Sequence, residues 1–323
     1  MQKKDKTQTD GKASFAPSSS RVLAIALPAI YLVILTLFCI TYNIIPGPEF
    51  LILCFFIYAA YSKRSKHFLK DWLPFLTIFV SYQAMYSLVG AVAGIVHVSE
   101  PIVAELQLFG SIPTVMLQQL YRMPILDYMG AFFYSLHFFA PTIFGFFLWK
   151  NSAKHYYKYT IALAILTYSA LITFLIFPVA PPWYGVDGVT RVLFDVDASL
   201  GVPVYRTLYD FLQPNQFAAF PSLHSALPWL IALYALKLEK TKALPILAFP
   251  FGVWFSAVYL GEHYIVDVIG GIAYATIAFV IAEKLIPYIQ LRRANRMHKT
   301  VEASNEIAVP ASKLQSSGES LTQ

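Results

Sequence analysis

Residues 264–285, YIVDVIGGIAYATIAFVIAEKL, form an almost uninterrupted apolar block whose charged side chains are Asp267, Glu283 and Lys284. A run of about 20 apolar residues is long enough to cross the hydrocarbon core of a bilayer as a helix. The block therefore predicts a membrane-spanning helix with Asp267 near its beginning. Because an ionisable residue there is costly unless it is paired or functional, the block also marks a candidate site.

The same pattern recurs along the chain, which has 323 residues, 57% of them hydrophobic and 13% charged, and a mean hydropathy of +0.57. This apolar content exceeds what a soluble domain of this size needs for its core, so we expect an all-α, polytopic membrane helix bundle of about eight spans. The predicted spans are residues 22–42, 47–61, 72–95, 127–149, 158–178, 218–236, 243–261 and 264–285. Residues 101–122 mix polar and apolar side chains and predict an amphipathic helix at the membrane surface, with a re-entrant segment as the alternative.

Polar termini flank the membrane domain, which we place at residues 21–290. Residues 1–20 and 291–323 lack the apolar surface that would offset the entropy cost of ordering, so we expect both to be disordered tails. Lys and Arg cluster in alternate connections, which predicts that both tails are cytoplasmic. The other connections, including the long segment 179–217, then lie on the extracytoplasmic or lumenal face. This distribution accounts for the net charge of +6 without nucleic acid binding.

Two short segments place histidines at the start of predicted spans on that face, residues 221–224 (PSLH) and residues 261–267 (GEHYIVD). His263 and Asp267 are four residues apart, so on a helix the carboxylate would accept a proton from one imidazole nitrogen and leave the other available. Such an imidazole can attack phosphorus while His224 protonates the departing oxygen, and the two helix starts would suit a phosphate. Taken alone, the His-Asp pair also fits a satisfied polar pair between helices or two metal ligands.

These motifs resemble those of the type 2 phosphatidic acid phosphatase superfamily, the lipid phosphate phosphatases. Residues 221–224, Ser256, His263 and Asp267 look like its second and third signature motifs. Residues 180–184 (APPWY), 219–225 (AFPSLHS) and 263–267 (HYIVD), and more weakly 136–141 (LHFFAP), look like the fungal inositol phosphorylceramide synthases. The resemblance implies a six-helix catalytic core without a metal or cofactor. It also implies that His263 forms a covalent phosphohistidine, that Asp267 orients it, and that His224 is the acid and then the base.

The chain departs from the phosphatase branch in its basic residues. It contains no Arg-Pro dipeptide, so the first signature motif is absent, and Ala257 stands where an Arg is expected after Ser256. A phosphate monoester brings close to two negative charges and needs several cations, whereas a phosphodiester brings one. We therefore expect a diester donor, unless Arg191 or Arg206 restores the missing charge.

The sequence thus predicts a membrane phosphotransferase that moves a phospho-headgroup, such as phosphoinositol, from a glycerophospholipid donor to a lipid alcohol acceptor such as ceramide. Hydrolysis of a lipid phosphate and a non-catalytic transporter are the alternatives. The further residues expected to bind substrate are Ser222, Ser256, Trp183, Tyr184 and Arg191. His137 lies inside the fourth predicted span and is expected to be a packed residue.

Overall fold

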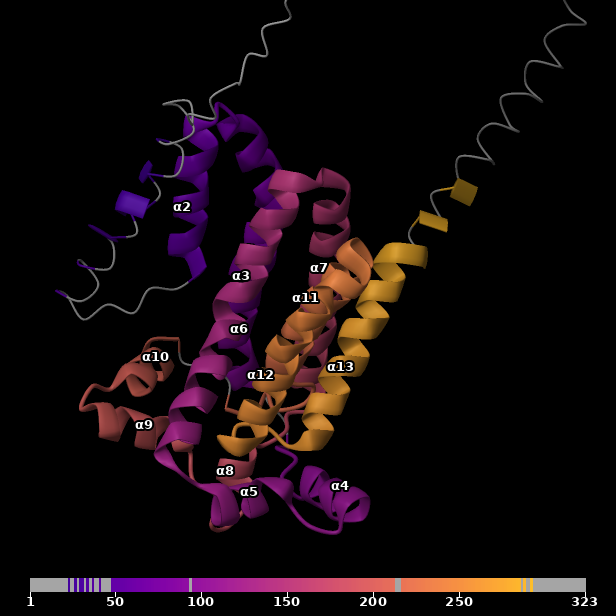
Figure 1. The fold of residues 1–323 in the computed structure, drawn as a ribbon. Helices are drawn as coiled ribbons and strands as arrows, with labels where there is room; N and C mark the ends of the chain where they lie inside the picture. The colour runs from indigo at the N-terminus through magenta and orange to yellow at the C-terminus, as the bar shows by residue number, and fades with distance from the viewer. Residues whose placement is uncertain are drawn as a thin grey trace, which may run out of the picture. The chain divides into compact units, whose positions relative to one another are not determined.

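The computed structural model describes residues 48–92, 95–212 and 216–285 continuously, with isolated positions between Leu23 and Thr41 and between Pro287 and Arg292 (Figure 1). The expected tails, apart from Leu291 and Arg292, and most of the first expected span, residues 22–42, lie outside the described residues. Within the described part, the backbone is helical and forms no strand beyond isolated β-bridges, which confirms the all-α expectation. The chain divides into two compact units, Met1–Leu73 and Pro74–Gln323.

The first unit contains α2 (Pro48–Tyr61) and the beginning of α3 (Ser65–Val92). A tight turn joins them, in which Lys63 has a φ of 57° and the amide of Arg64 donates to the carbonyl of Ala59. Aromatic side chains then pack between the two helices, with ring centroids 5.9 Å apart for both Phe56–Phe68 and Phe55–Trp72. The predicted second span and the start of the third thus form a helical hairpin.

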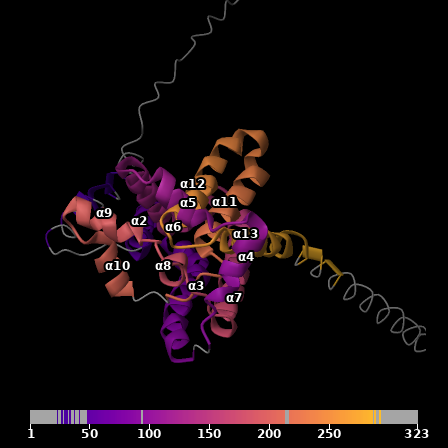
Figure 2. The ribbon, with the colours of Figure 1, turned by 90° about the horizontal axis from the view of Figure 1, so that it is seen from below.

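The second unit consists of long helices that run side by side and shorter helices gathered toward one end (Figures 1 and 2). The long elements are α6 (Pro124–Asn151), α7 (Ala153–Ile176), α11 (Leu223–Glu239), α12 (Ala248–Tyr259) and α13 (Ile265–Val280). The short helices are α4 (Ser99–Phe109), α5 (Pro113–Tyr121), α8 (Pro182–Gly185), α9 (Val192–Leu200) and α10 (Val204–Leu212). A 3-10 segment, Lys240–Leu247, joins α11 to α12, and a π-helical turn, Ile281–Leu285, follows α13.

Four helical segments of the described chain are long and apolar enough to cross a membrane: Pro124–Asn151, Ala153–Ile176, Leu223–Tyr259 and Ile265–Lys284. The third of these is bent back on itself, because Lys240 adopts a φ of 51° and α11 and α12 then pack as an antiparallel pair. Trp229 on α11 contacts Trp254 on α12 with ring centroids 5.6 Å apart. The sixth, seventh and eighth expected spans therefore correspond to α11, α12 and α13.

Two expected elements differ from the structure. The seventh span was expected over residues 243–261, but its α-helix begins only at Ala248, since Pro245 lacks the amide that an α-helical hydrogen bond requires. The single amphipathic helix expected over residues 101–122 is wrong: the segment forms α4 and α5. Gly110 between them adopts a left-handed φ of 71°, and Pro113 begins the next helix.

The start of α11 lies unusually close to α13 at Gly271. A Cβ atom on Gly271 would lie 2.2 Å from the backbone oxygen of Ser222 and 2.1 Å from Oγ of Ser225. At this crossing the Ser222 amide donates to the carbonyl of Asp267 (3.1 Å) and Ser225 Oγ donates to the carbonyl of Val268 (3.0 Å). Only glycine at position 271 permits this approach, so it sets the spacing of the two helix starts.

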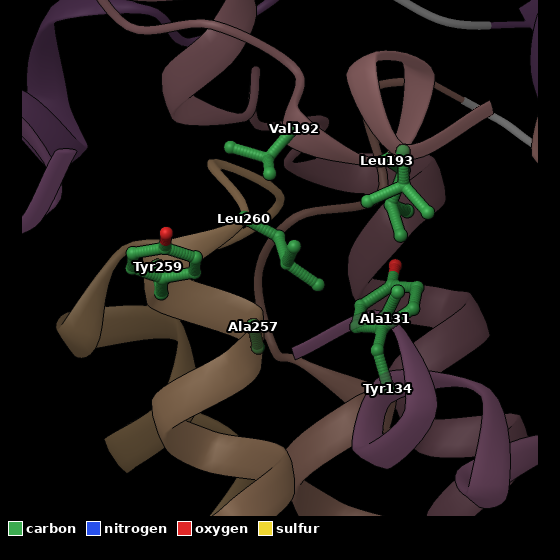
Figure 3. Packing of buried hydrophobic residues seen from close by; sticks show 8 residues of the cluster. Ala131, Tyr134, Val192, Leu193, Ala257, Tyr259 and Leu260 are labelled. Carbon is green, nitrogen blue, oxygen red and sulfur yellow. The ribbon is translucent and has the colours of Figure 1, made fainter. Parts of the chain in front are cut away.

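An apolar cluster fixes the 179–217 connection to the ends of α6 and α12 (Figure 3). Figure 3 shows Val192 and Leu193 of α9 facing Leu260 and Tyr134 across the end of the bundle. The cluster's buried members are Ala131, Tyr134, Val192, Leu193, Val196, Ala257, Tyr259 and Leu260. Burial of this apolar surface holds α9 against the ends of α6 and α12.

We predict that Gly271→Ala lowers thermal stability strongly, because the new methyl group meets backbone that cannot rotate away; overpacking of a core typically costs about 1–3 kcal/mol or more. Thermal unfolding of the purified protein in detergent measures the effect. Gly270→Ala is the matched control, since there the obstacle at 2.4 Å is the outer edge of the Phe220 ring, which can turn. Equal losses for the two variants would contradict this reading of the crossing.

Candidate active site

Three connections of the second unit meet where α11 and α13 begin. The amide of Trp183 donates to the carbonyl of Gly261, and that of Val192 donates to the carbonyl of Leu260. From the segment before α6, the Gln118 side chain donates to the carbonyl oxygens of Thr190 and Tyr259. The distribution of Lys and Arg predicts that these connections lie on one face of the membrane, and in the structure they meet at one end of this unit.

His224 owes its place to the amino-terminal cap of α11. Ser222 is the N-cap residue, and its Oγ accepts a hydrogen bond from the amide of Ser225, which satisfies one of the unpaired donors of the first turn. His224 is the second residue of the helix, so its ring lies at the helix start. Ser222 itself is fully buried, and the contacts it makes belong to the cap and to α13.

His263 lies in the corner between α12 and α13 and not on a helix. Its amide and that of Glu262 both donate to the carbonyl of Ala257, and Gly261 turns the chain there with a φ of 81°. A Cβ atom at Gly261 would also lie 2.8 Å from the carbonyl oxygen of Thr190. The corner thus requires glycine twice over, for its backbone conformation and for space.

Asp267 approaches His263 through a helix cap. Tyr264 is the N-cap residue of α13, and Asp267 at the third helical position accepts a hydrogen bond from its amide (2.9 Å) in a capping box. Oδ2 of Asp267 lies 3.6 Å from Nδ1 of His263, too far for a hydrogen bond. The expectation that a helical i, i+4 arrangement joins this pair is wrong, although the two side chains are neighbours.

The tautomer of His263 follows from its closest partner. Nδ1 lies 3.0 Å from the carbonyl oxygen of Ala219, which can only accept, so Nδ1 carries the proton. Nε2 of a neutral His263 then has a free lone pair, and it faces Nδ1 of His224 at 2.9 Å. His224 donates in this contact, and its Nε2 is buried with no hydrogen-bond partner among the described residues.

A third histidine lies beside this pair. The ring of His137, on α6, has its centroid 3.9 Å from that of His224, and its Nδ1 donates to the carbonyl of Tyr134 (2.6 Å). Tyr134 stacks on His224 with centroids 4.2 Å apart and an angle of 18°. From the sequence, His137 is expected to be a packed residue, and no motif points to Tyr134. Their spacing of three residues, which puts both on one face of the fourth expected span, is the signal that the sequence offers.

The positive charge of Arg191 is compensated by Glu262. Its Nε donates to Oε1 of Glu262 (2.7 Å) and a terminal nitrogen donates to Oε2 (3.1 Å), a two-point ion pair in which Glu262 is buried and Arg191 partly buried. The guanidinium also lies over the rings of Trp183, Phe194 and Tyr209, at 4.0–4.6 Å. Burial lowers the pKa of Arg191, but Glu262 more than offsets this, so the pKa lies above its ordinary value.

The remaining expected substrate residues lie around the site with different surroundings. Trp183 is half-buried under Arg191, and its Nε1 has no hydrogen-bond partner among the described residues. Tyr184 is exposed and packs edge-on against Phe217. Ser256 is buried within α12, where its Oγ donates to the carbonyl of Gly252 (2.6 Å). No group of three or more His, Cys, Asp or Glu side chains in the described part of the chain is arranged to hold a metal ion.

Comparison with known proteins gives a family and several relatives. A profile described as the PAP2 superfamily matches residues 99–281. The chain is 29% identical over 173 residues to the phosphoinositol dihydroceramide synthase of Bacteroides thetaiotaomicron, covering 49% of this chain and 56% of that one. No solved structure matches.

Fungal relatives match over shorter stretches. The inositol phosphorylceramide synthase catalytic subunit of Schizosaccharomyces pombe is 32% identical over 126 residues, or 35% of this chain and 30% of its own length. That of Saccharomyces cerevisiae is 33% identical over 116 residues, or 32% and 28%. The matched region spans about half the length of the bacterial relative and less than a third of the fungal ones.

We predict that Arg191→Met destabilises the protein by about 3–5 kcal/mol, because it removes the charged partner of the buried Glu262 carboxylate and leaves only the Tyr209 hydroxyl donating to it. The double variant Arg191→Met, Glu262→Gln should recover much of this loss, since it removes the unpaired charge. Chemical unfolding in detergent provides the measurement. Arg206→Met is the control, because Arg206 is exposed. A single variant as stable as the wild type would show that the pair contributes nothing.

Proposed function

The chain belongs to the PAP2 superfamily, and we propose that it is a membrane phosphotransferase that moves phosphoinositol from a glycerophospholipid to the hydroxyl of a ceramide through a phosphohistidine on His263. The observation that carries the proposal is the contact between Nε2 of His263 and Nδ1 of His224, in a tautomer that leaves His263 nucleophilic. Relatives named for inositol phosphorylceramide or phosphoinositol dihydroceramide synthesis support the choice of substrates. As an integral membrane protein, the enzyme would take both lipids from the bilayer.

In the first half-reaction, the lone pair of His263 Nε2 attacks phosphorus, an N–P bond forms, and the bond from phosphorus to the diacylglycerol oxygen breaks. The phosphate would replace His224 in its present contact with His263. His224 in its imidazolium form, which the charge of the arriving phosphodiester favours, gives a proton to the departing oxygen and becomes neutral. Diacylglycerol leaves, and inositol phosphate stays on His263.

In the second half-reaction, neutral His224 takes the proton of the ceramide hydroxyl as its oxygen attacks phosphorus. The O–P bond forms, the N–P bond breaks, and both histidines return to their starting states. The negative charge of the transferred group would be stabilised by amides of the first turn of α11, which offers helix-start donors beside His224. The first turn of α13 is less suited to this, because Asp267 and Glu105 already accept from the amides of Tyr264 and Val266.

A diester donor matches the charges around the site. Arg191 is neutralised by Glu262, and Arg206 is exposed with its guanidinium over the Phe194 ring. Ala257 lies in the buried apolar cluster, where the larger, charged Arg of the phosphatase motif would have to displace neighbouring side chains. A substrate with one negative charge therefore needs less compensation here than a phosphate monoester would.

The main prediction is that purified protein makes a new inositol-containing sphingolipid from phosphatidylinositol only when ceramide is supplied. His263→Ala should lower the rate by about a thousandfold or more, because it removes the nucleophile. Labelled ceramide and thin-layer chromatography follow the product. His155→Ala, which changes a histidine on the first turn of α7, is the control and should retain activity. Release of inositol phosphate without ceramide would favour hydrolysis, and substrate movement that survives His263→Ala would favour a transporter.

The charge argument gives a separate prediction. Dephosphorylation of phosphatidic acid, a monoester, should be at least about tenfold slower than transfer from phosphatidylinositol under the same conditions, because the site lacks the cations that a doubly charged group needs. Phosphate release and transfer are measured side by side at matched lipid content. A phosphatidic acid phosphatase rate equal to or above the transfer rate would overturn the diester assignment.

A further inference from the structure

Glu105 is a buried carboxylate that the proposed chemistry does not use. It lies on α4, is 0% exposed, and comes from a segment outside the histidine motifs. Glutamate is rarely buried to this extent unless it is paired. Its Oε1 accepts a hydrogen bond from the amide of Val266 (3.1 Å), in the first turn of α13, and its Oε2 has no hydrogen-bond partner among the described residues. The residue therefore links α4 to the helix start that follows His263.

Helix capping alone does not require this carboxylate, because Asp267 already caps α13 through the amide of Tyr264. A second acid at the same helix start carries two costs. Burial raises the pKa of Glu105 to about 7, the backbone amides of Val266 and Ile265 lower it in part, and the charge of Asp267 raises it further. Removing an ionisable group from water and placing it near a like charge opposes folding. These costs argue against a stabilising role for Glu105 and for a role in the geometry of the α13 helix start.

We propose that Glu105 is a positioning residue of the active site: by holding the amide of Val266, it fixes the first turn of α13 and so keeps His263 and Asp267 in their places opposite His224. This inference rests on the proposed function. In the chain, Val266 lies between Tyr264, the N-cap residue, and Asp267. Oδ2 of Asp267 accepts a hydrogen bond from the Tyr264 amide (2.9 Å) and lies 3.6 Å from Nδ1 of His263. If the turn loosens, both distances change together.

The expected loss in kcat follows from how precisely catalytic groups must be placed. Catalytic groups must be held within about 0.5 Å of their productive positions, and a displacement of about 1 Å can cost about a hundredfold in rate. Loss of the Glu105 contact should therefore lower kcat by about tenfold to a hundredfold. KM should stay within about twofold, because Glu105 is not proposed to touch either lipid.

The test compares two substitutions that match Glu105 in size. Glu105→Met fills the same space but offers no carbonyl oxygen to the Val266 amide, whereas Glu105→Gln keeps one. We expect Glu105→Met to show the loss in kcat and Glu105→Gln to stay within about threefold of the wild type. Gln107→Ala, an exposed change on the same helix, is the control and should behave as the wild type. Rates are expressed per folded protein, from the monodisperse fraction after gel filtration.

Three outcomes would overturn the proposal: Glu105→Met with a wild-type kcat, a change confined to KM, or Glu105→Gln as slow as Glu105→Met. If Glu105→Met does not fold, Glu105→Asp replaces it, since the shorter side chain keeps the charge but not the reach, and the same expectations apply. The comparison uses whichever reaction the wild type catalyses, transfer or hydrolysis. Absence of transfer from phosphatidylinositol in the wild type would count against the proposed function, while the variants still test the role of Glu105.

Discussion

The close crossing of α11 and α13 is the constraint on which the candidate site depends. At Gly271 the two helices approach so closely that no side chain fits between them, and the backbone of Ser222 bonds directly to that of Asp267. The same crossing brings the carbonyl of Ala219, just before α11, to Nδ1 of His263, just before α13. The backbone packing at the crossing therefore brings His224 and His263 within hydrogen-bonding distance, 2.9 Å between Nδ1 and Nε2.

Two arginines at this end of the bundle are paired with carboxylates before any substrate binds. Arg191 and Glu262 neutralise each other, and Arg122 is similarly shared between Asp127 and Asp195. In surroundings of low polarity, an ion that arrives with one charge is easier to compensate with neutral donors than an ion with two. The sequence pointed to this through two absences, the missing Arg-Pro motif and the alanine at position 257. The structure adds that the arginine available nearby already has a partner.

Much of the architecture could be predicted from the sequence because apolar blocks of spanning length are a strong signal, and α6, α7, α11 and α13 lie close to their expected ranges. The grouping of His224, His263 and Asp267 could be predicted from motif spacing and the order of the spans. The local geometry could not be predicted, because a separation of four residues between His263 and Asp267 occurs both within a helix and across a helix cap. The contacts of Glu105 and Arg191 join residues far apart in the chain, which no local pattern reports.

The tautomer of His263 also changes the part that Asp267 would play. In the resting site the Nδ1 proton points to the carbonyl of Ala219, so that carbonyl, rather than the carboxylate, keeps Nε2 nucleophilic. Asp267 lies 3.6 Å away, and its Oδ1 has no hydrogen-bond partner among the described residues. Formation of an N–P bond would place positive charge on the imidazole ring, and a carboxylate at this distance attracts that charge while a carbonyl dipole does so less. Asp267 would then act mainly on the intermediate, by drawing the Nδ1 proton toward itself as the ring becomes charged.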